Sequence, residues 1–349
     1  MKVAIATVQV PFLRGGAELL ASSLQQAFES RGHVADIVTI TFKWYPSATL
    51  TECMIAGRMM DLTEVNGEKI DLVVALKLPA FYLRHEHKVA WLLHQHRQAY
   101  DLWQTPFGDM HAWPDGKGLR NLIVRHDTRY LAEASRVYTI SENVTARLRR
   151  YNGIASMPLY HPPQGYASLY CESFENFVFY PSRIDPMKRQ RLLVEAARYL
   201  RSGMRVVIAG GGGDMEAAHL QSLVHEYGLE NRVTLAVFIS EDEKRSYYAR
   251  CRCVFFGAYD EDYGYVTLEA FYAHKPVVAL RDTGGALEFV EHGVNGYLCD
   301  SDARSLAATL DRLGDSPDLA ERLGSAAHTT LGKKLIDWDY VVTSLIDSR

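Results

Sequence analysis

Short apolar runs alternate with helical patterns along this 349-residue chain, and the alternation restricts the fold more than any other feature. The first apolar run, residues 2–10, leads through the loop Pro11–Gly16 into Ala17–Arg31, where leucines recur at helical spacing. Strands that alternate with helices form parallel sheets, because the chain must cross back over the sheet before it starts the next strand. The sequence therefore predicts an α/β protein.

The amino-terminal half contains one such alternating unit. We expect further strands at Val34–Ile40, Asp71–Ala75, Val89–Leu93 and Arg136–Ile140, and helices at Asn121–Ala134 and Glu142–Arg150. In two segments, Thr49–Gly67 and Trp103–Gly118, apolar residues recur at neither helical nor strand spacing. We predict that both are irregular loops that contact an acceptor.

A proline-rich joint at Pro158, Pro162 and Pro163 then interrupts the pattern, and we interpret it as a linker. The alternation restarts after it. The expected strands are Phe177–Tyr180, Arg205–Ala209, Val233–Phe238, Cys253–Phe256 and Pro276–Leu280, and the expected helices are Arg189–Leu200, Asp214–Tyr227, Glu241–Arg250, Tyr265–Ala273 and Ala286–Glu291. Two doubly wound, Rossmann-like units facing a cleft are the predicted architecture, with ligands at the carboxyl ends of the strands.

Composition excludes several classes of protein. The net charge of −4 provides no basic field for a nucleic-acid partner, so none is predicted. The five cysteines are scattered, which favours reduced thiols in a cytoplasmic protein. The first apolar run is too short for a signal peptide, and no other run is long enough to span a bilayer.

The segment 259–270 carries the richest chemistry. It follows an apolar strand and opens a helix, so the backbone N–H groups of Gly264, Tyr265 and Val266 can bind anionic oxygens. Glu261 lies in the loop and Glu269 lies inside the helix, and carboxylates accept hydrogen bonds from sugar hydroxyls. This arrangement suits a ligand with a diphosphate centre and hydroxyl-rich ends. Taken alone, the segment could also be an acidic solvated loop beside a surface glutamate.

The next residues make the pattern specific. A strand, a Gly284-Gly285 turn with Glu288, and an Asn295-Gly296 turn follow in order. The run from Glu261 to Leu298 resembles the donor-binding end of the GT-B retaining glycosyltransferases of family four (glycosyl transferases group 1), of the bacterial surface-polysaccharide type. The resemblance extends over essentially the whole chain, with Asp262-Tyr263-Gly264-Tyr265 where Gly-Phe-Gly-Leu is commoner in the family.

The resemblance implies roles for the residues of the second half. Glu269 would hold the ribose hydroxyls of a nucleotide sugar, and Glu261 would hold hydroxyls of the donor sugar. Arg183 and Lys188 follow the strand Phe177–Tyr180, and cations there can stabilise a departing diphosphate.

The resemblance also implies roles for the first half. Gly15 and Gly16 match the glycine loop that closes over the diphosphate, and His94 matches a histidine near the donor sugar and the acceptor. Arg97 and Tyr100 are further candidates for lining an acceptor groove. The adjacent His96 suggests a metal site only weakly, because no carboxylate partner accompanies the two histidines.

The implied activity is transfer of a hexosyl group from a UDP- or GDP-activated sugar to a saccharide or lipid-linked acceptor, with retention and without a metal or other cofactor. The expected domains are 1–160 on the acceptor side, 161–330 on the nucleotide-sugar side, and 331–349 as a helix crossing back to the first. A nucleotide-sugar 2-epimerase and a non-catalytic binding subunit are the alternatives.

Other patterns lead to weaker hypotheses. Arg147, Arg149 and Arg150 suggest peripheral contact with anionic lipid at the inner face of a membrane, although arginines on a helix more often form a solvated face. The glycine run 210–213 lacks the spacing of a dinucleotide fingerprint, which makes an oxidoreductase the minor interpretation. Two Asp-x-Asp triplets, 260–262 and 337–339, resemble the metal signature of a different glycosyltransferase fold and are not assigned a metal.

Overall fold

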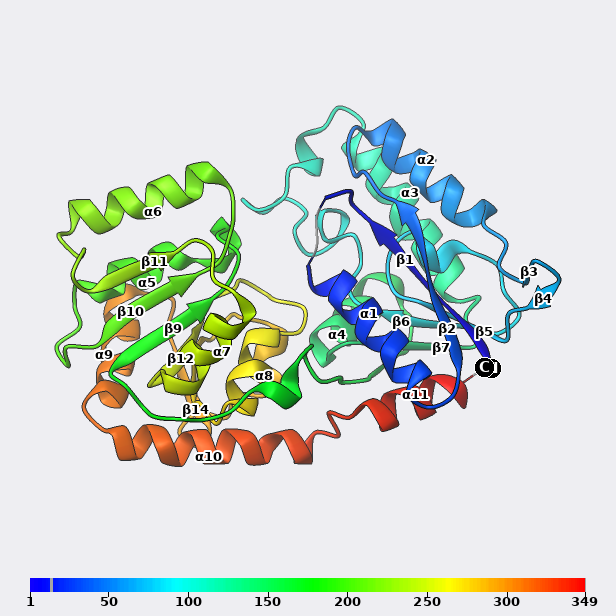
Figure 1. Cartoon of the computed structure of the whole chain (residues 1–349). Coiled ribbons are helices and arrows are strands. Elements are labelled where there is room, and N and C mark those ends of the chain that lie inside the picture. The colour runs from blue at the N-terminus through cyan, green and yellow to red at the C-terminus, as the bar shows by residue number, and fades with distance from the viewer. Residues whose placement is uncertain (13–14, 349) are drawn as a thin grey trace. The chain divides into compact units, whose positions relative to one another are not determined.

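A computed structural model describes residues 1–12 and 15–348, which form two compact units (Figure 1). The first unit comprises Met1–Gln164 and Ile336–Arg349, and the second comprises Gly165–Leu335. The sequence places these divisions at 160/161 and 330/331, a few residues earlier in each case. No helix in the described residues combines the length and apolar character needed to cross a membrane.

The first unit is built on a six-stranded parallel sheet in the order β2-β1-β5-β6-β7-β8. Its strands are β1 (Lys2–Gln9), β2 (Val34–Thr41), β5 (Leu72–Ala75), β6 (Lys88–Leu92), β7 (Arg136–Thr139) and β8 (Met157–Pro158), and its helices are α1 (Gly16–Glu29), α2 (Ser47–Met59), α3 (Gly116–Leu131), α4 (Glu142–Asn152) and α11 (Trp338–Ile346). A small hairpin of β3 (Glu64–Val65) and β4 (Glu68–Lys69) lies outside this sheet. The predicted doubly wound α/β class is confirmed.

The expectation that Thr49–Gly67 is irregular is wrong, because α2 occupies most of it. Its buried residues are Leu50, Cys53, Met54 and Gly57, which recur at the spacing of one helix face. Gly57 is required there, since a Cβ atom would lie 2.6 Å from the Pro79 carbonyl oxygen. Polar and β-branched residues between the buried positions obscure the period in the sequence.

The proline-rich joint also differs from the expected linker. Residues 161–163 are buried in the first unit, and His161 lies edge-on to Trp91 with ring centroids 5.2 Å apart. Trp338 of α11 packs against the same histidine at 5.7 Å, and α11 lies beside α1 (Figure 1). Aromatic packing thus ties both the joint and the carboxyl-terminal helix into the core of the first unit.

Four polar side chains are buried together inside the first unit. The carboxylate of Asp127 accepts hydrogen bonds from the hydroxyls of Tyr82, at 2.5 Å, and Tyr100, at 2.7 Å. The amide of Asn152 lies 3.3 Å from the Tyr100 hydroxyl. Tyr100 is only 2% exposed, so the expectation that it lines an acceptor groove is wrong. Its hydroxyl satisfies a buried carboxyl group instead.

This cluster makes the stability of the first unit depend on pH. Burial raises the pKa of Asp127 from 3.8 to about 7, against the lowering effect of the two tyrosine hydroxyls. Because the folded state binds the proton more tightly, the stabilisation is complete below pH 3.8 and is lost as the pH rises to about 7. We expect the free energy of unfolding of the wild type, relative to Asp127→Asn, to fall by about 1.4 kcal/mol per pH unit across this window. Urea unfolding at a series of pH values tests this, and parallel curves for the two proteins would contradict it.

The second unit contains another six-stranded parallel sheet, ordered β11-β10-β9-β12-β13-β14. Its strands are β9 (Phe177–Pro181), β10 (Arg205–Ala209), β11 (Val233–Ala236), β12 (Cys253–Phe256), β13 (Val277–Leu280) and β14 (Gly296–Cys299), and its helices are α5 (Gln190–Ala197), α6 (Asp214–Glu226), α7 (Glu241–Arg250), α8 (Tyr265–Tyr272), α9 (Ala303–Gly314) and α10 (Pro317–Lys333). The last strand and the helices α9 and α10 extend the unit beyond the elements expected from the sequence.

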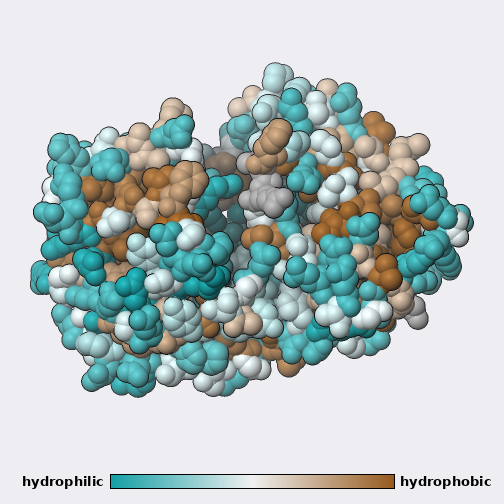
Figure 2. Space-filling view, viewed as in Figure 1, coloured by the Kyte–Doolittle hydropathy of each residue, from teal (hydrophilic) through white to brown (hydrophobic). Residues whose placement is uncertain are grey.

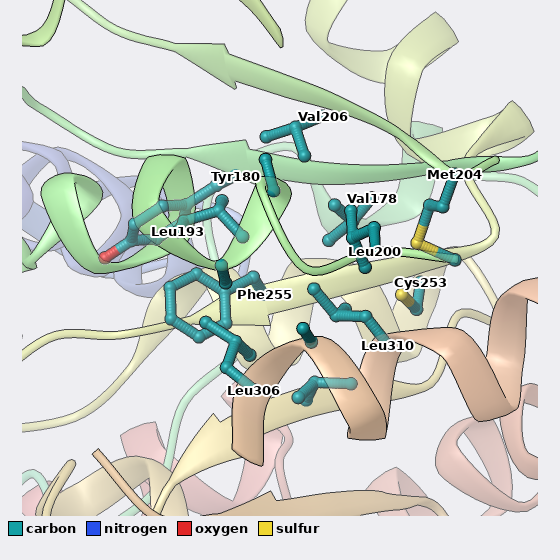
Figure 3. Close-up of a cluster of buried hydrophobic side chains, with 14 of the residues drawn as sticks. Val178, Tyr180, Leu193, Leu200, Met204, Val206, Cys253, Phe255, Leu306 and Leu310 are labelled. Atoms are coloured by element: carbon teal, nitrogen blue, oxygen red, sulfur yellow. The ribbon is translucent and has the colours of Figure 1, made fainter. Parts of the chain in front are cut away.

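The core of the second unit lies between its sheet and the helices on one face. Val178 of β9 and Phe255 of β12 meet Leu193 of α5 and Leu306 of α9 in one buried cluster (Figure 3). These strands are apolar along their length, as expected of strands covered on both faces. The packing fixes the carboxyl ends of β9 and β12, from which the candidate site is built.

Candidate functional site

The order of the second sheet brings two chemically rich loops together. In order along the chain its strands are arranged 3-2-1-4-5-6, so β9 and β12 are neighbours although two other strands separate them in the sequence. The loops 182–189 and 257–264 leave the carboxyl ends of these two strands. In doubly wound sheets, the point where the strand order reverses is where ligands bind.

An ion pair joins the two loops at this point. The ammonium group of Lys188 contacts the Oε2 atom of Glu261, and each side chain is about a quarter exposed. Lys188 ends a short 3-10 helix, η5 (Pro186–Lys188), whose first turn is capped by Asp185. The hydroxyl of Tyr180 donates to the Lys188 carbonyl oxygen at 2.7 Å. The structure therefore brings together one cation and one carboxylate that the sequence assigns to a ligand site.

The backbone of Glu261 is held by the neighbouring loop after β13. Its N–H donates to the Thr283 carbonyl at 3.1 Å, and its carbonyl accepts from the Gly285 N–H at 2.8 Å. A Cβ atom on Gly285 would lie 2.5 Å from the Asp262 carbonyl oxygen, so only glycine permits this approach. The Gly-Gly turn thus positions Glu261.

Arg183, the second predicted cation, lies in the same loop with a different partner. Its side chain is 68% exposed, and its guanidinium group lies 3.3 Å from Asp185. Its carbonyl oxygen accepts a hydrogen bond from the side chain of Gln190. The structure therefore anchors the backbone of Arg183 and leaves its charge at the surface of the site.

The amino terminus of α8 opens at the same edge. Gly264 precedes the helix with φ of +94°, and a Cβ atom there would lie 2.9 Å from the Cβ atom of Ala286. Within the described chain, no side chain caps this helix, whose first two residues are Tyr265 and Val266. An uncapped helix start carries partial positive charge and suits an anion.

Glu269 lies one turn further along α8 and is held by two partners from α7. The hydroxyl of Tyr248 donates to its Oε2 atom at 2.6 Å, and the ammonium group of Lys244 lies 3.1 Å from its Oε1 atom. The Glu269 side chain is 13% exposed. The sequence reasoning did not identify Lys244 or Tyr248 as partners, although their spacing of four residues places them on one face of a helix.

The charges of Glu261 and Glu269 both act on the phenol of Tyr265. Burial, together with the charges of Glu261 and Glu269, raises the pKa of its phenol above the usual value. The hydroxyl therefore stays protonated at neutral pH and remains a hydrogen-bond donor.

The edge of this unit next to β11 is apolar. Figure 2 shows brown, apolar side chains gathered on the visible face of this unit. Phe238 and Met215 are each 88% exposed, and Val237 is 41% exposed. The Phe238 ring lies 3.4 Å from where a Cβ atom of Gly211 would be, so a bare glycine loop and an aromatic ring are adjacent. Exposed aromatic rings in such positions offer a stacking surface.

The glycine loop of the first unit lies at the carboxyl end of β1. Gly15 precedes α1, and its N–H donates to the Glu18 carboxylate at 2.8 Å. Gly16 is the first residue of the helix. Two residues of the predicted loop, 13 and 14, lie outside the described residues.

The two candidate histidines, His94 and His96, follow β6 instead of lying within it, because this strand ends at Leu92. The Nδ1 atom of His94 is 2.5 Å from the Gln95 carbonyl oxygen. Burial is the main cause that lowers the pKa of His96 to about 3, so its ring is neutral, and it packs edge-on against Phe42. In the described residues, no three His, Cys, Asp or Glu side chains gather in a way that would hold a metal ion.

The predicted arginine surface on α4 is partly wrong. Arg147 is 6% exposed and lies 3.4 Å from Asp101, which also pairs with Arg97. Only Arg149 and Arg150 are exposed. Arg147 therefore belongs to a buried ion-pair cluster, and Arg97 belongs to it as well.

Comparison with known proteins identifies related sequences. Residues 172–330 match the family model "Glycosyl transferases group 1". Over 125 residues the chain is 36% identical to the alpha-1,3/1,6-mannosyltransferase ALG2 of Dictyostelium discoideum, covering 34% of this chain and 30% of that protein. Over 238 residues it is 30% identical to the D-inositol 3-phosphate glycosyltransferase of Salinispora tropica, covering 63% and 47%. The alignments thus span less than two thirds of these relatives.

Solved structures share the fold over nearly the whole chain. Sucrose-phosphate synthase from Thermosynechococcus elongatus superposes with a TM-score of 0.78 at 19% identity, covering 99% of this chain and 97% of that one. The Anabaena protein Alr3699/HepE, solved in complex with UDP and glucose, gives 0.73 at 19% identity, covering 99% and 98%. The chain has the GT-B fold, and its residues 172–330 match the model of the glycosyl transferases group 1 family.

Proposed function

We propose that this protein is a retaining, metal-independent glycosyltransferase. It moves a hexosyl group from a UDP- or GDP-activated sugar to a hydroxyl of a saccharide or lipid-linked acceptor. The observation that supports this best is the Lys188–Glu261 pair at the point of strand reversal in a group 1 domain. A cation of the kind that binds phosphate thus lies beside a carboxylate of the kind that accepts hydrogen bonds from sugar hydroxyls, which supports the proposal.

The donor would engage the described residues in order along its length. Glu269 accepts hydrogen bonds from the ribose hydroxyls, and the start of α8 with Lys188 and Arg183 receives the diphosphate. Glu261 holds hydroxyls of the donor sugar. The exposed Phe238 ring beside the glycine loop offers a stacking face for the base.

In the reaction, the acceptor oxygen forms a bond to the anomeric carbon while the bond from that carbon to the phosphate oxygen breaks. The acceptor attacks the face of the sugar from which the phosphate leaves, so the configuration is retained, and the leaving phosphate oxygen takes the acceptor proton. Lys188 then interacts with a diphosphate that gains negative charge, an interaction stronger in the transition state than in the ground state. Gly15, Gly16 and His94 of the first unit complete the assignment as groups near the diphosphate and the acceptor.

The acceptor is proposed from the relatives. A GDP-mannose-dependent alpha-(1-6)-phosphatidylinositol monomannoside mannosyltransferase of Mycobacterium tuberculosis is 32% identical over 180 residues, covering 48% of this chain and 45% of that protein. A lipid-linked acceptor would place the present protein in the cytoplasm, at the inner face of a membrane.

A ligand screen tests the proposal. A ligand that binds only the folded state raises the apparent stability. We expect a UDP- or GDP-sugar to raise the unfolding temperature more than ADP- or dTDP-sugars at equal concentration. No shift with any of the four would contradict the proposal. Incubation without acceptor addresses the alternatives, since free epimerised sugar would favour the 2-epimerase, and bound donor that is never transferred or hydrolysed would favour a binding subunit.

The contact from α7 allows a finer test of the proposed donor site. We expect Tyr248→Phe to raise KM for the donor by about threefold to tenfold with little change in kcat, because it removes one hydrogen bond that orients the Glu269 carboxylate. Tyr247→Phe is the matched control, since that ring stacks on Phe179. Equal kinetics for the two variants would show that the Tyr248 hydroxyl has no positioning role.

A further inference from the structure

A basic depression lies on the surface of the first unit, formed by α3 and the end of α4. Its volume is about 420 Å³, which is large enough for an organic ligand. Seven residues line it: Arg120, Asn121, Val124, Arg125, Thr128, Arg150 and Tyr151. None of the seven is acidic, and none belongs to the residues proposed above to bind the donor or the acceptor.

The three arginines of this depression have no ion-pair partner among residues 1–12 and 15–348. Arg120 is held in place, because its Nε atom donates to the Ala99 carbonyl at 2.9 Å and its guanidinium lies over the Trp103 ring at 5.0 Å. The guanidinium of Arg150 lies 5.2 Å from the Tyr151 ring centroid. Two of the three charges are thus positioned by packing and still lack an anion.

The sequence of α3 does not balance this charge. The helix carries one lysine and three arginines, and its only acidic residue, Asp127, is buried in the core with Tyr82 and Tyr100. Like charges on one helix face destabilise a protein unless something neutralises them. Arg147 shows the contrast, since the structure buries it against Asp101.

We propose that this depression binds the phosphate group of an organic phosphate. Guanidinium groups bind phosphate through paired N–H donors, and three arginines that line one depression without a carboxylate favour an anion of more than one charge. The side chains of Asn121 and Tyr151 add neutral polar groups for the rest of the ligand. A soluble phosphate ester and a phospholipid headgroup share this chemistry.

The experiment compares the same headgroup in both forms. Glycerol 3-phosphate is titrated calorimetrically, and flotation measures binding to phosphatidylcholine vesicles with and without phosphatidic acid. The test variant is Arg125→Gln with Arg150→Gln. The matched control is Arg129→Gln with Arg149→Gln, which removes the same charge from exposed positions of the same two helices outside the depression. The wild type and both variants keep the same donor site, so any binding of the probe there contributes equally to all three measurements.

We expect the test variant to lose at least about tenfold in affinity and the control to stay within about twofold, with both variants folded by circular dichroism. Binding of glycerol 3-phosphate identifies a soluble ligand, and binding only to vesicles with phosphatidic acid identifies a lipid headgroup. Equal losses in the two variants, or no binding of either probe by the wild type, would overturn the proposal. If the test variant is unfolded, Arg150→Gln against Arg149→Gln gives the same comparison with one charge changed.

Discussion

Replacing Lys188 by alanine is expected to lower kcat/KM for the sugar donor by about 10²–10³-fold while the protein stays folded. The ammonium group is the cation that the structure holds at the strand reversal, in contact with Glu261. Its removal takes away the charge that stabilises the leaving diphosphate. It also removes the cation that contacts the Glu261 carboxylate, so the repulsion between this carboxylate and the anionic ligand rises and adds to the loss.

Arg205→Ala is the matched control for Lys188→Ala. Arg205 is an exposed cation that pairs with Glu175, and it lies at the amino end of β10, at the opposite edge of the same sheet. We expect kcat/KM of the Arg205→Ala variant to stay within about twofold of the wild type, since exposed ion pairs contribute little to stability. Donor turnover under single-turnover conditions separates the chemical step from product release. Near-normal turnover in Lys188→Ala would refute the assignment of the diphosphate site.

Glu269→Ala is expected to have the second largest effect, a loss of about 10²-fold in donor kcat/KM. The carboxylate would bind ribose through both oxygens, while Tyr248 and Lys244 fix its orientation. Truncation removes the ligand contact and leaves the Tyr248 hydroxyl buried without its acceptor. That unsatisfied group costs about 1–3 kcal/mol of stability, so the unfolding temperature should fall as well.

Glu269→Gln distinguishes the two contributions. The amide keeps an oxygen that accepts from Tyr248, but it cannot pair ionically with Lys244, so we expect most of the stability to return and donor affinity to stay low. Glu175→Ala is the control, since that partly exposed glutamate pairs with Arg205 and Arg250 at the other edge of the unit. Full donor affinity in Glu269→Gln would show that the carboxylate charge has no part in binding.

Much of the second unit could be predicted from the sequence because its signals are local. The apolar run before Glu261 specifies β12, and the glycine at 264 marks the helix start that follows. In the first unit, α2 was missed because polar and β-branched residues stand between the residues of its buried face in the sequence. A helix face is defined by what it packs against, and the Pro79 backbone that meets Gly57 lies far along the chain.

The candidate site was likewise predicted only in part from the sequence. Its loops, glycines and charged residues could be found by their order along the chain. Their partners could not, because Tyr248 reaches Glu269 only through the packing of α7 against the sheet. The same limit explains the arginines of α4, where Arg147 is buried against Asp101 and Arg150 faces the depression on α3.

By itself, then, the sequence determined the α/β class, the strand–helix alternation and the candidate donor residues. These follow from periodicity and from backbone requirements that act over a few residues. Only the tertiary structure decided which charges are paired, which are buried and which face the surface. Burial and ion pairing depend on residues brought together from distant parts of the chain. The sequence around a single side chain therefore does not show which residue it will contact.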